Sequence, residues 1–243
     1  MPVGNRANSG GVVTSPITVA SFVVTEISPL YVFIVHQGAG TPLTVSSVTW
    51  NGSENFTLVA RKSDSVTQNT VDLYELKNPT ATTANVVVTL SANPVNGAYV
   101  AVIGTTGMAT DTAHRTVYTR NDTDGTGPGT TVVDSVNNDL VLHAAQGNAT
   151  TITFDGGEDT TSTEADNISG SGFSGGLSTK AATGASTVVG CTDVEVYSEV
   201  AIAVIPAAQG ASPALPWLPV TQVMRGSSVR VVASGFTPGV GVE

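Results

Sequence analysis

Residues 43–91 read LTVSSVTWNGSENFTLVARKSDSVTQNTVDLYELKNPTATTANVVVTLS. The stretch contains four apolar runs rich in β-branched residues, at 43–50, 56–61, 71–76 and 86–90. Asn51-Gly52 follows the first run, and both residues tolerate the positive φ of a tight hairpin. Runs of this length, separated by turn residues, predict strands joined by hairpins.

The first run changes phase in its middle. Leu43 and Val45 have odd numbers, whereas Val48 and Trp50 have even ones. One extra residue at Ser46-Ser47 would bring all four side chains to one face, so we predict a β-bulge there.

The flanking segments carry two kinds of strand pattern. Ile17, Val19, Val23 and Ile27 follow a period of two, broken at Ser21, and predict a first strand with these four side chains on one side. Segments 30–35 and 98–103 are apolar on both faces, which predicts strands in the middle of a sheet that is covered on both sides.

The second half of the chain predicts further strands. They are expected at Val132, Val133 and Val136, at 140–144, at 177–182, and at Val194, Val196, Val200, Ile202 and Val204. Polar segments 104–129 and 156–176 are expected to be surface loops.

The composition limits the classes of partner. Nine basic and nineteen acidic residues give a net charge of −10, which disfavours binding to nucleic acid or to an anionic membrane. The first residues lack the apolar core of a secretory signal, so we expect synthesis in a host cytoplasm. With one cysteine, Cys191, no internal disulfide can form.

Candidate chemical sites are few. Gly172–Gly176 matches G-x-S-x-G around Ser174, but a nucleophile elbow needs a strand before it and a helix after it, and neither is expected. The histidines, His36, His114 and His143, are isolated in sequence, and His36 and His143 are expected at strand ends or in satisfied sandwich positions. We therefore expect no catalytic residue, no cofactor and no metal site.

Two loops leave open the alternative of a Ca²⁺ site, and two tryptophans leave open that of a sugar-binding surface. Asp122 and Asp124 match half of a calcium loop, but Arg120 stands where that loop needs an acid. An acidic cluster, interpreted as solvated charge with a Ca²⁺ site as the alternative, comprises Asp155, Glu158, Asp159, Glu164 and Asp166. Trp50 and Trp217 could stack on sugars, although burial is the commoner fate of tryptophan.

The chain is therefore divided into three parts. Residues 1–14 are expected to form an N-terminal arm, 15–207 a β-sandwich domain, and 208–243 an extended C-terminal arm with one or two short strands. Pro213, Pro216 and Pro219 keep the C-terminal arm extended. Its expected assembly contacts are Leu215, Trp217, Leu218, Val220, Val223 and Met224.

Five segments carry a resemblance to a known group of proteins. They are VTWNG (48–52), FTLV (56–59), VDLYELKNP (71–79), ANVVVTLS (84–91) and SEVAIAVIPA (198–207). Over residues 16–207 this series resembles the jelly-roll-like β-sandwich modules of bacteriophage virion proteins, such as capsid decoration, head-fibre and tail modules. The resemblance implies an all-β, jelly-roll-like antiparallel β-sandwich and no catalytic residues.

The expected function is structural. We expect a non-enzymatic virion protein, a capsid decoration or cement protein that binds other virion proteins through its arms as a homo-oligomer. The alternative is a carbohydrate-binding, lectin-like adhesion module of a tail fibre or cell surface, which would need an exposed aromatic or Ca²⁺ site.

Overall fold

The structure is a computed structural model that describes residues 3–9, 11–64, 68–122, 129–147, 152–154, 174–192 and 197–207. The chain divides into two compact units, 1–208 and 209–243, and every described residue belongs to the first unit. Strands are the only regular elements of the described residues, and none of these residues forms a helix that could span a membrane.

Sixteen strands occur in the described ranges. In chain order they are β1 (Val3–Asn8), β2 (Ile17–Val23), β3 (Leu30–Gln37), β4 (Val45–Trp50), β5 (Glu54–Asn55), β6 (Thr57–Ser63), β7 (Asn69–Leu76), β8 (Thr83–Leu90), β9 (Ala98–Thr105), β10 (Tyr118–Asp122), β11 (Gly129–Asp134), β12 (Leu140–Gly147), β13 (Thr153–Phe154), β14 (Ser174–Ala181), β15 (Ser186–Thr192) and β16 (Tyr197–Val204).

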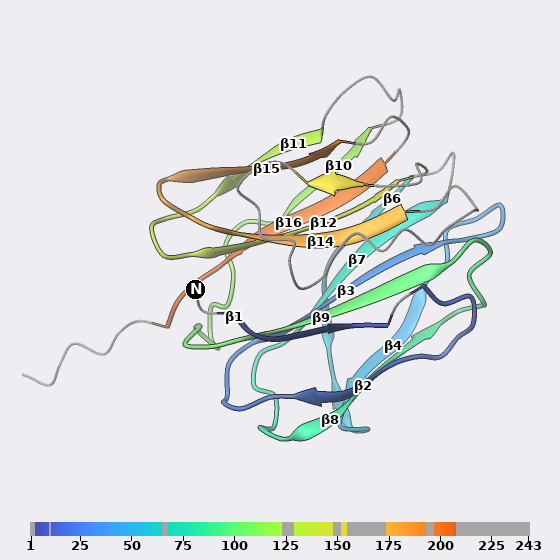
Figure 1. The fold of residues 1–243 in the computed structure, drawn as a ribbon, viewed down its shortest axis with the longest axis horizontal. Coiled ribbons are helices and arrows are strands. Elements are labelled where there is room, and N and C mark those ends of the chain that lie inside the picture. Colours follow the sequence, from blue (N-terminus) through green and yellow to red (C-terminus); the bar gives the residue numbers. More distant parts are fainter. Residues whose placement is uncertain are drawn as a thin grey trace, which may run out of the picture. The chain divides into compact units, whose positions relative to one another are not determined.

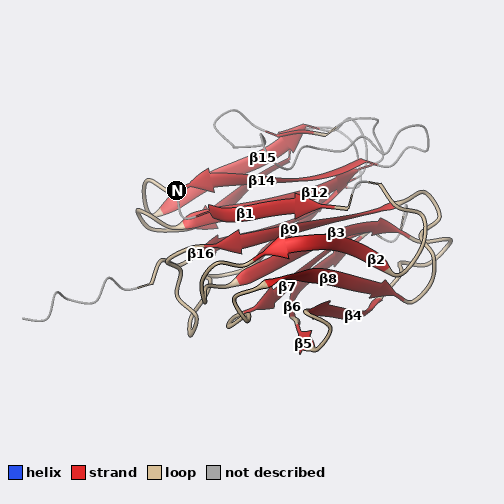
Figure 2. Cartoon of the chain, turned by 60° about the horizontal axis from the view of Figure 1, so that its bottom comes forward, coloured by secondary structure: helices blue, strands red, loops and turns tan. Residues whose placement is uncertain are grey.

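The strands form four antiparallel sheets. Sheet 1 has the order β2-β8-β4-β5, sheet 2 β1-β9-β3-β7-β6, sheet 3 β10-β16-β12-β14, and sheet 4 β11-β15-β13. One apolar cluster joins sheets 1 and 2, a second joins sheets 2 and 3, and two smaller ones join sheets 3 and 4. The sheets are therefore stacked in the order 1-2-3-4 (Figure 1), and Figure 2 shows that the regular elements drawn are all strands.

Strand pairing is nested in both halves of the chain. In sheets 1 and 2, β1 pairs with β9, β2 with β8, β3 with β7, and β4 with β5. In sheets 3 and 4, β10 pairs with β16, β11 with β15, and β12 with β14. This nesting across two facing sheets is the jelly-roll arrangement, so the all-β jelly-roll prediction is confirmed. The structure differs from the expected single sandwich because it contains two jelly-roll units in tandem. Sheets 1 and 2 form the first jelly-roll unit, and sheets 3 and 4 form the second.

The connections within 43–91 differ from the prediction. Asn51 and Gly52 have φ of 50° and 73° and join β4 to β5, which confirms that hairpin. The chain then crosses from sheet 1 to sheet 2 before β6, and back to sheet 1 after β7. The β6–β7 pair is a second hairpin, whereas the expected hairpin from β7 to β8 is wrong.

The predicted bulge in β4 is confirmed. The pairing of β4 with β8 shifts between Val45 and Ser47, and Leu43, Val48 and Trp50 all lie in the cluster between sheets 1 and 2. Trp50 is fully buried and its indole N–H donates to the Thr80 carbonyl at 3.1 Å. Trp50 is thus a core residue and offers no sugar platform.

The first predicted strand is correct in place but wrong in phase. The pairing of β2 with β8 shifts between Val19 and Phe22, and Ser21 has a φ of 53°. This bulge turns Phe22 into the core and leaves Val23 39% and Ile27 66% exposed. The side chains beyond the bulge therefore face opposite to the expectation.

The N-terminal arm is also a correction. Residues Val3–Asn8 form edge strand β1 on β9, and Val12 bridges to Ala98. The Arg6 guanidinium donates to the Thr179 hydroxyl of sheet 3. Because the ladder uses backbone groups, this polar segment joins the sheet without an apolar pattern of its own.

Other expectations fall into three groups. The two-faced strands β3 and β9 are confirmed: alternate side chains enter the clusters on either side of sheet 2. Val136 lies outside β11 and is 46% exposed, while β10 and β15 form where no strand was expected. Val194, Val196 and the six contact residues of the C-terminal arm lie outside the described residues.

Sheets 2 and 3 approach each other closely at Gly175. A Cβ added there would lie 2.5 Å from Val35 Cγ2, too close for any real contact. The Val35 side chain is β-branched and fully packed, so it cannot move aside easily.

Gly175→Ala should therefore lower the free energy of unfolding by about 1–3 kcal/mol through overpacking. Urea denaturation measures the loss, and Gly184→Ala is the control because nothing lies within 4 Å of an added Cβ there. Adding Val35→Ala to Gly175→Ala should cost less than the sum of the two single losses. A neutral Gly175→Ala variant would show that sheets 2 and 3 are not packed this closely.

Candidate functional site

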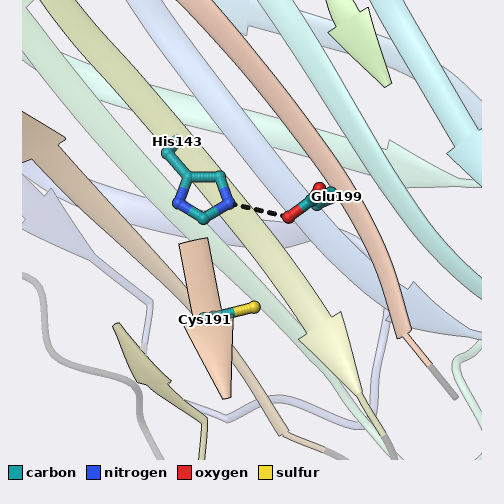
Figure 3. A group of neighbouring side chains, drawn as sticks. All are labelled: His143, Cys191 and Glu199. Carbon is teal, nitrogen blue, oxygen red and sulfur yellow. Dashed lines mark hydrogen bonds and ion pairs between the residues drawn. The ribbon is translucent and has the colours of Figure 1, made fainter. Parts of the chain in front are cut away.

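Sheets 3 and 4 bring three chemically reactive side chains together inside the second jelly-roll unit. His143 comes from the middle of β12, Glu199 from β16 and Cys191 from β15 (Figure 3). On β12, His143 has the phase of Val141 and Ala145, whose side chains face sheet 4. Glu199 has the phase of Ala201 and Ala203, which face sheet 4 too.

His143 and Glu199 form a direct pair. Ala145 is the partner of Glu199 in the ladder, and His143 is the partner of Ala201, so the two side chains are diagonal neighbours on one face. The His143 Nε2 lies 3.1 Å from Glu199 Oε2. The Phe154 ring of β13 is nearly perpendicular to the imidazole, with ring centroids 5.4 Å apart, so β13 also contacts the site.

Two hydroxyl groups also contact the pair. Ser178 Oγ of β14 lies 3.4 Å from His143 Nδ1, and the Thr131 hydroxyl of β11 donates to Glu199 Oε1. His143 and Cys191 are fully buried, and Glu199 is 1% exposed. A buried carboxylate needs such partners, because an unpaired charge in the interior is strongly destabilising.

The set of side chains allows two chemical uses. One ligand atom from each of His143, Cys191 and Glu199 lies within 4.8 Å of the other two, and imidazole, thiolate and carboxylate are all transition-metal ligands. The Ser178 hydroxyl, the His143 imidazole and the Glu199 carboxylate also contact one another in the order found in a hydrolytic triad. A nucleophile must reach a substrate, however, and Ser178 is fully buried between the sheets.

The first jelly-roll unit contains a second buried histidine–carboxylate pair. His36 Nε2 of β3 lies 3.0 Å from Asp72 Oδ2 of β7, and Arg61 Nε of β6 lies 2.7 Å from Asp72 Oδ1. The Arg61 guanidinium therefore covers a buried carboxylate. His143 confirms the expectation of a satisfied sandwich position. His36 is also buried in the sandwich, but its Nδ1 has no hydrogen-bond partner among the described residues.

A surface cleft of about 690 Å³ opens beside β6 and β7. Its polar lining comes from Asn55, Thr57, Glu75, Lys77, Asn78 and His114. The Tyr31 hydroxyl donates to Glu75 Oε1 at 2.9 Å. Burial, and then the negative charge and hydrogen bond of Glu75, raise the pKa of the Tyr31 phenol well above its ordinary value.

The remaining sequence candidates do not join these sites. Ser174 begins β14, is buried, and its Oγ has no partner among the described residues; it does not stand on a strand-to-helix turn. His114 forms a bridge with Val204, and its Nδ1 lies 2.7 Å from the Arg115 carbonyl oxygen. Asp124, Trp217 and the acidic cluster between Asp155 and Asp166 lie outside the described residues.

The group of His143, Cys191 and Glu199 was missed from sequence because its members are far apart along the chain. One signal was available. His143 and Glu199 each occupy the inward phase of an apolar strand, where an ionisable side chain requires a buried partner. Which residue supplies that partner depends on the pairing of β12 with β16 and on the stacking of sheet 4.

In the comparisons with known proteins, no family model, no curated protein and no solved structure matches this chain.

The pair of His143 and Glu199 yields a stability prediction. His143→Leu leaves the Glu199 carboxylate buried without the imidazole, so the free energy of unfolding in urea should fall by about 3–5 kcal/mol. The double variant His143→Leu/Glu199→Leu should lose less than the sum of the two single variants. His114→Leu is the control and should lose no more than about 1 kcal/mol. A loss below about 1 kcal/mol for His143→Leu would contradict the buried pair.

Proposed function

We propose that the protein is a non-enzymatic structural component of a virus particle, a capsid decoration or cement protein. The observation that carries this proposal is the tandem of two jelly-roll units, stacked through sheets 2 and 3. Jelly rolls are the architecture of many viral capsid domains, and also of lectins. The proposal of a virion role is therefore supported by the fold, and the charge and the packing of the protein add to that support.

The packing suits a rigid building block. The central strands β3, β7 and β12 are buried along almost their whole length, and side chains of all four sheets fill the spaces between layers. The net charge of −10 keeps such a block soluble and directs it to less acidic protein surfaces. The partners proposed are other virion proteins, including further copies of this chain.

The attachment is assigned to the C-terminal arm, 208–243. The arm contains Leu215, Trp217 and Leu218 between prolines that restrict its conformations, so little entropy is lost when it docks. Its apolar side chains would lie on a neighbouring subunit or on the capsid shell. A packing of the arm on its own sandwich is the competing arrangement.

A specific observation favours a second candidate, a carbohydrate-binding module. The cleft beside β6 and β7 presents amide, carboxylate, ammonium and imidazole groups, which can hydrogen-bond sugar hydroxyls. Trp50 is excluded as a stacking platform by its burial. Binding on a glycan array that is lost on Asn78→Ala would favour this candidate over the structural one.

Deletion of 208–243 tests the structural proposal. The truncated protein should remain folded, with a strand-type circular dichroism spectrum, and should fail to co-sediment with particles that bind the full-length chain. Trp217→Ser/Leu218→Ser should reduce binding in the same direction, while Leu58→Ser, at a side chain that is 47% exposed on the sandwich, is the control. Unchanged binding of the truncated protein would remove the arm as the connector.

A further inference from the structure

We propose that His143, Cys191 and Glu199 bind a divalent transition-metal ion, with Zn²⁺ as the preferred ion. The site goes beyond the proposed virion role and does not depend on it. It also replaces the expectation of no metal site, which rested on the spacing of ligands along the sequence. The ligands come together only when β12 and β16 pair and sheet 4 covers them.

The ligand atoms are close to the spacing that a metal requires. Around a tetrahedral Zn²⁺ with bonds of about 2.0–2.3 Å, two ligand atoms lie roughly 3.3–3.6 Å apart. His143 Nε2 and Glu199 Oε2 are 3.1 Å apart. One ligand atom from each of His143, Cys191 and Glu199 lies within 4.8 Å of the other two. Binding one ion would require the three ligand atoms to close from within 4.8 Å to this spacing.

A second set of contacts orients the ligands. A histidine that binds a metal through one nitrogen usually donates its other N–H to an oxygen, and Ser178 Oγ lies 3.4 Å from His143 Nδ1. Glu199 would bind through Oε2, which leaves Oε1 to accept the hydrogen bond from Thr131. Both hydroxyls thus have a role in the loaded site, which has one further tetrahedral position for a water molecule.

The charges of the loaded site balance. A thiolate, a carboxylate and a neutral imidazole carry two negative charges, which a divalent cation cancels, so the complete site can be buried without a net charge. Binding releases the Cys191 thiol proton to solvent, and the imidazole proton resides on Nδ1. The first jelly-roll unit provides a contrast, because Arg61 already neutralises Asp72 beside His36 and no thiol lies among the contacts of that pair.

Such an ion would connect sheets 3 and 4. His143 and Glu199 belong to neighbouring strands of sheet 3, and Cys191 belongs to β15 of sheet 4. A metal bound only by the folded state stabilises it in proportion to the logarithm of its concentration. The ion would therefore reinforce the second jelly-roll unit, in which the described residues form a smaller apolar cluster between the sheets.

Cobalt titration of the full-length protein tests the site, because Co²⁺ reports its ligands in its spectrum. One equivalent should give a thiolate-to-cobalt charge-transfer band and the intense visible bands of tetrahedral coordination, and Zn²⁺ should abolish both. Zn²⁺ should also raise the melting temperature of the chelator-treated protein. No thiolate band and no thermal shift would overturn the proposal.

Variants locate the site. Cys191→Ser, which nearly keeps the side-chain volume, should abolish the thiolate band, and Ser178→Ala should weaken Zn²⁺ binding by about 10–100-fold. His36→Gln is the matched control and should leave the band unchanged. A band that persists in Cys191→Ser, or that disappears in His36→Gln with the fold intact, would contradict the assignment. If Cys191→Ser does not fold, the spectrum of the unmodified protein and the Ser178→Ala affinity decide.

Discussion

The structure depends on the burial of sheets 2 and 3 on both of their faces. Strands β3, β9, β12 and β16 carry apolar side chains in both phases, so neither sheet can face water. Packing the two sheets together covers one face of each, and sheets 1 and 4 cover the other faces. The four-layer order and the tandem of jelly rolls both follow from this requirement, and the close contact of Gly175 with Val35 shows how tight the central interface is.

The same burial dictates the chemistry of the interior. An ionisable side chain that occupies an inward phase has no access to water, so its partners must come from the neighbouring strand or the facing sheet. His36 with Asp72 and His143 with Glu199 are two examples among the described residues, one inside each jelly-roll unit. They differ in what neutralises the carboxylate. In the first jelly-roll unit, Arg61 neutralises the Asp72 carboxylate. In the second, Cys191 lies near His143 and Glu199, and the three side chains together are suited to bind a cation.

Sequence patterns predicted the local features because these depend on neighbours in the chain. Asn51-Gly52, the bulge at Ser46-Ser47 and the two-faced strands were all correct. The predictions failed where pairing is non-local. β1 and β10 are polar edge strands stabilised by backbone hydrogen bonds, and the bulge at Ser21 reverses the phase that Val23 and Ile27 were expected to follow. The proximity of Cys191 to His143 requires the stacking of two sheets, which no spacing within the sequence encodes.

Hydrogen exchange, followed strand by strand in native buffer, tests most directly whether the two jelly rolls form one cooperative structure. If sheets 2 and 3 depend on each other for cover, amides of β3, β7, β12 and β16 should all exchange through global unfolding, with the same opening free energy and the same dependence on denaturant. A lower-energy opening that exposes β12 and β16 while β3 and β7 stay protected would contradict this. The second jelly roll would then unfold alone, and the shared central interface would not be the constraint that holds the structure together.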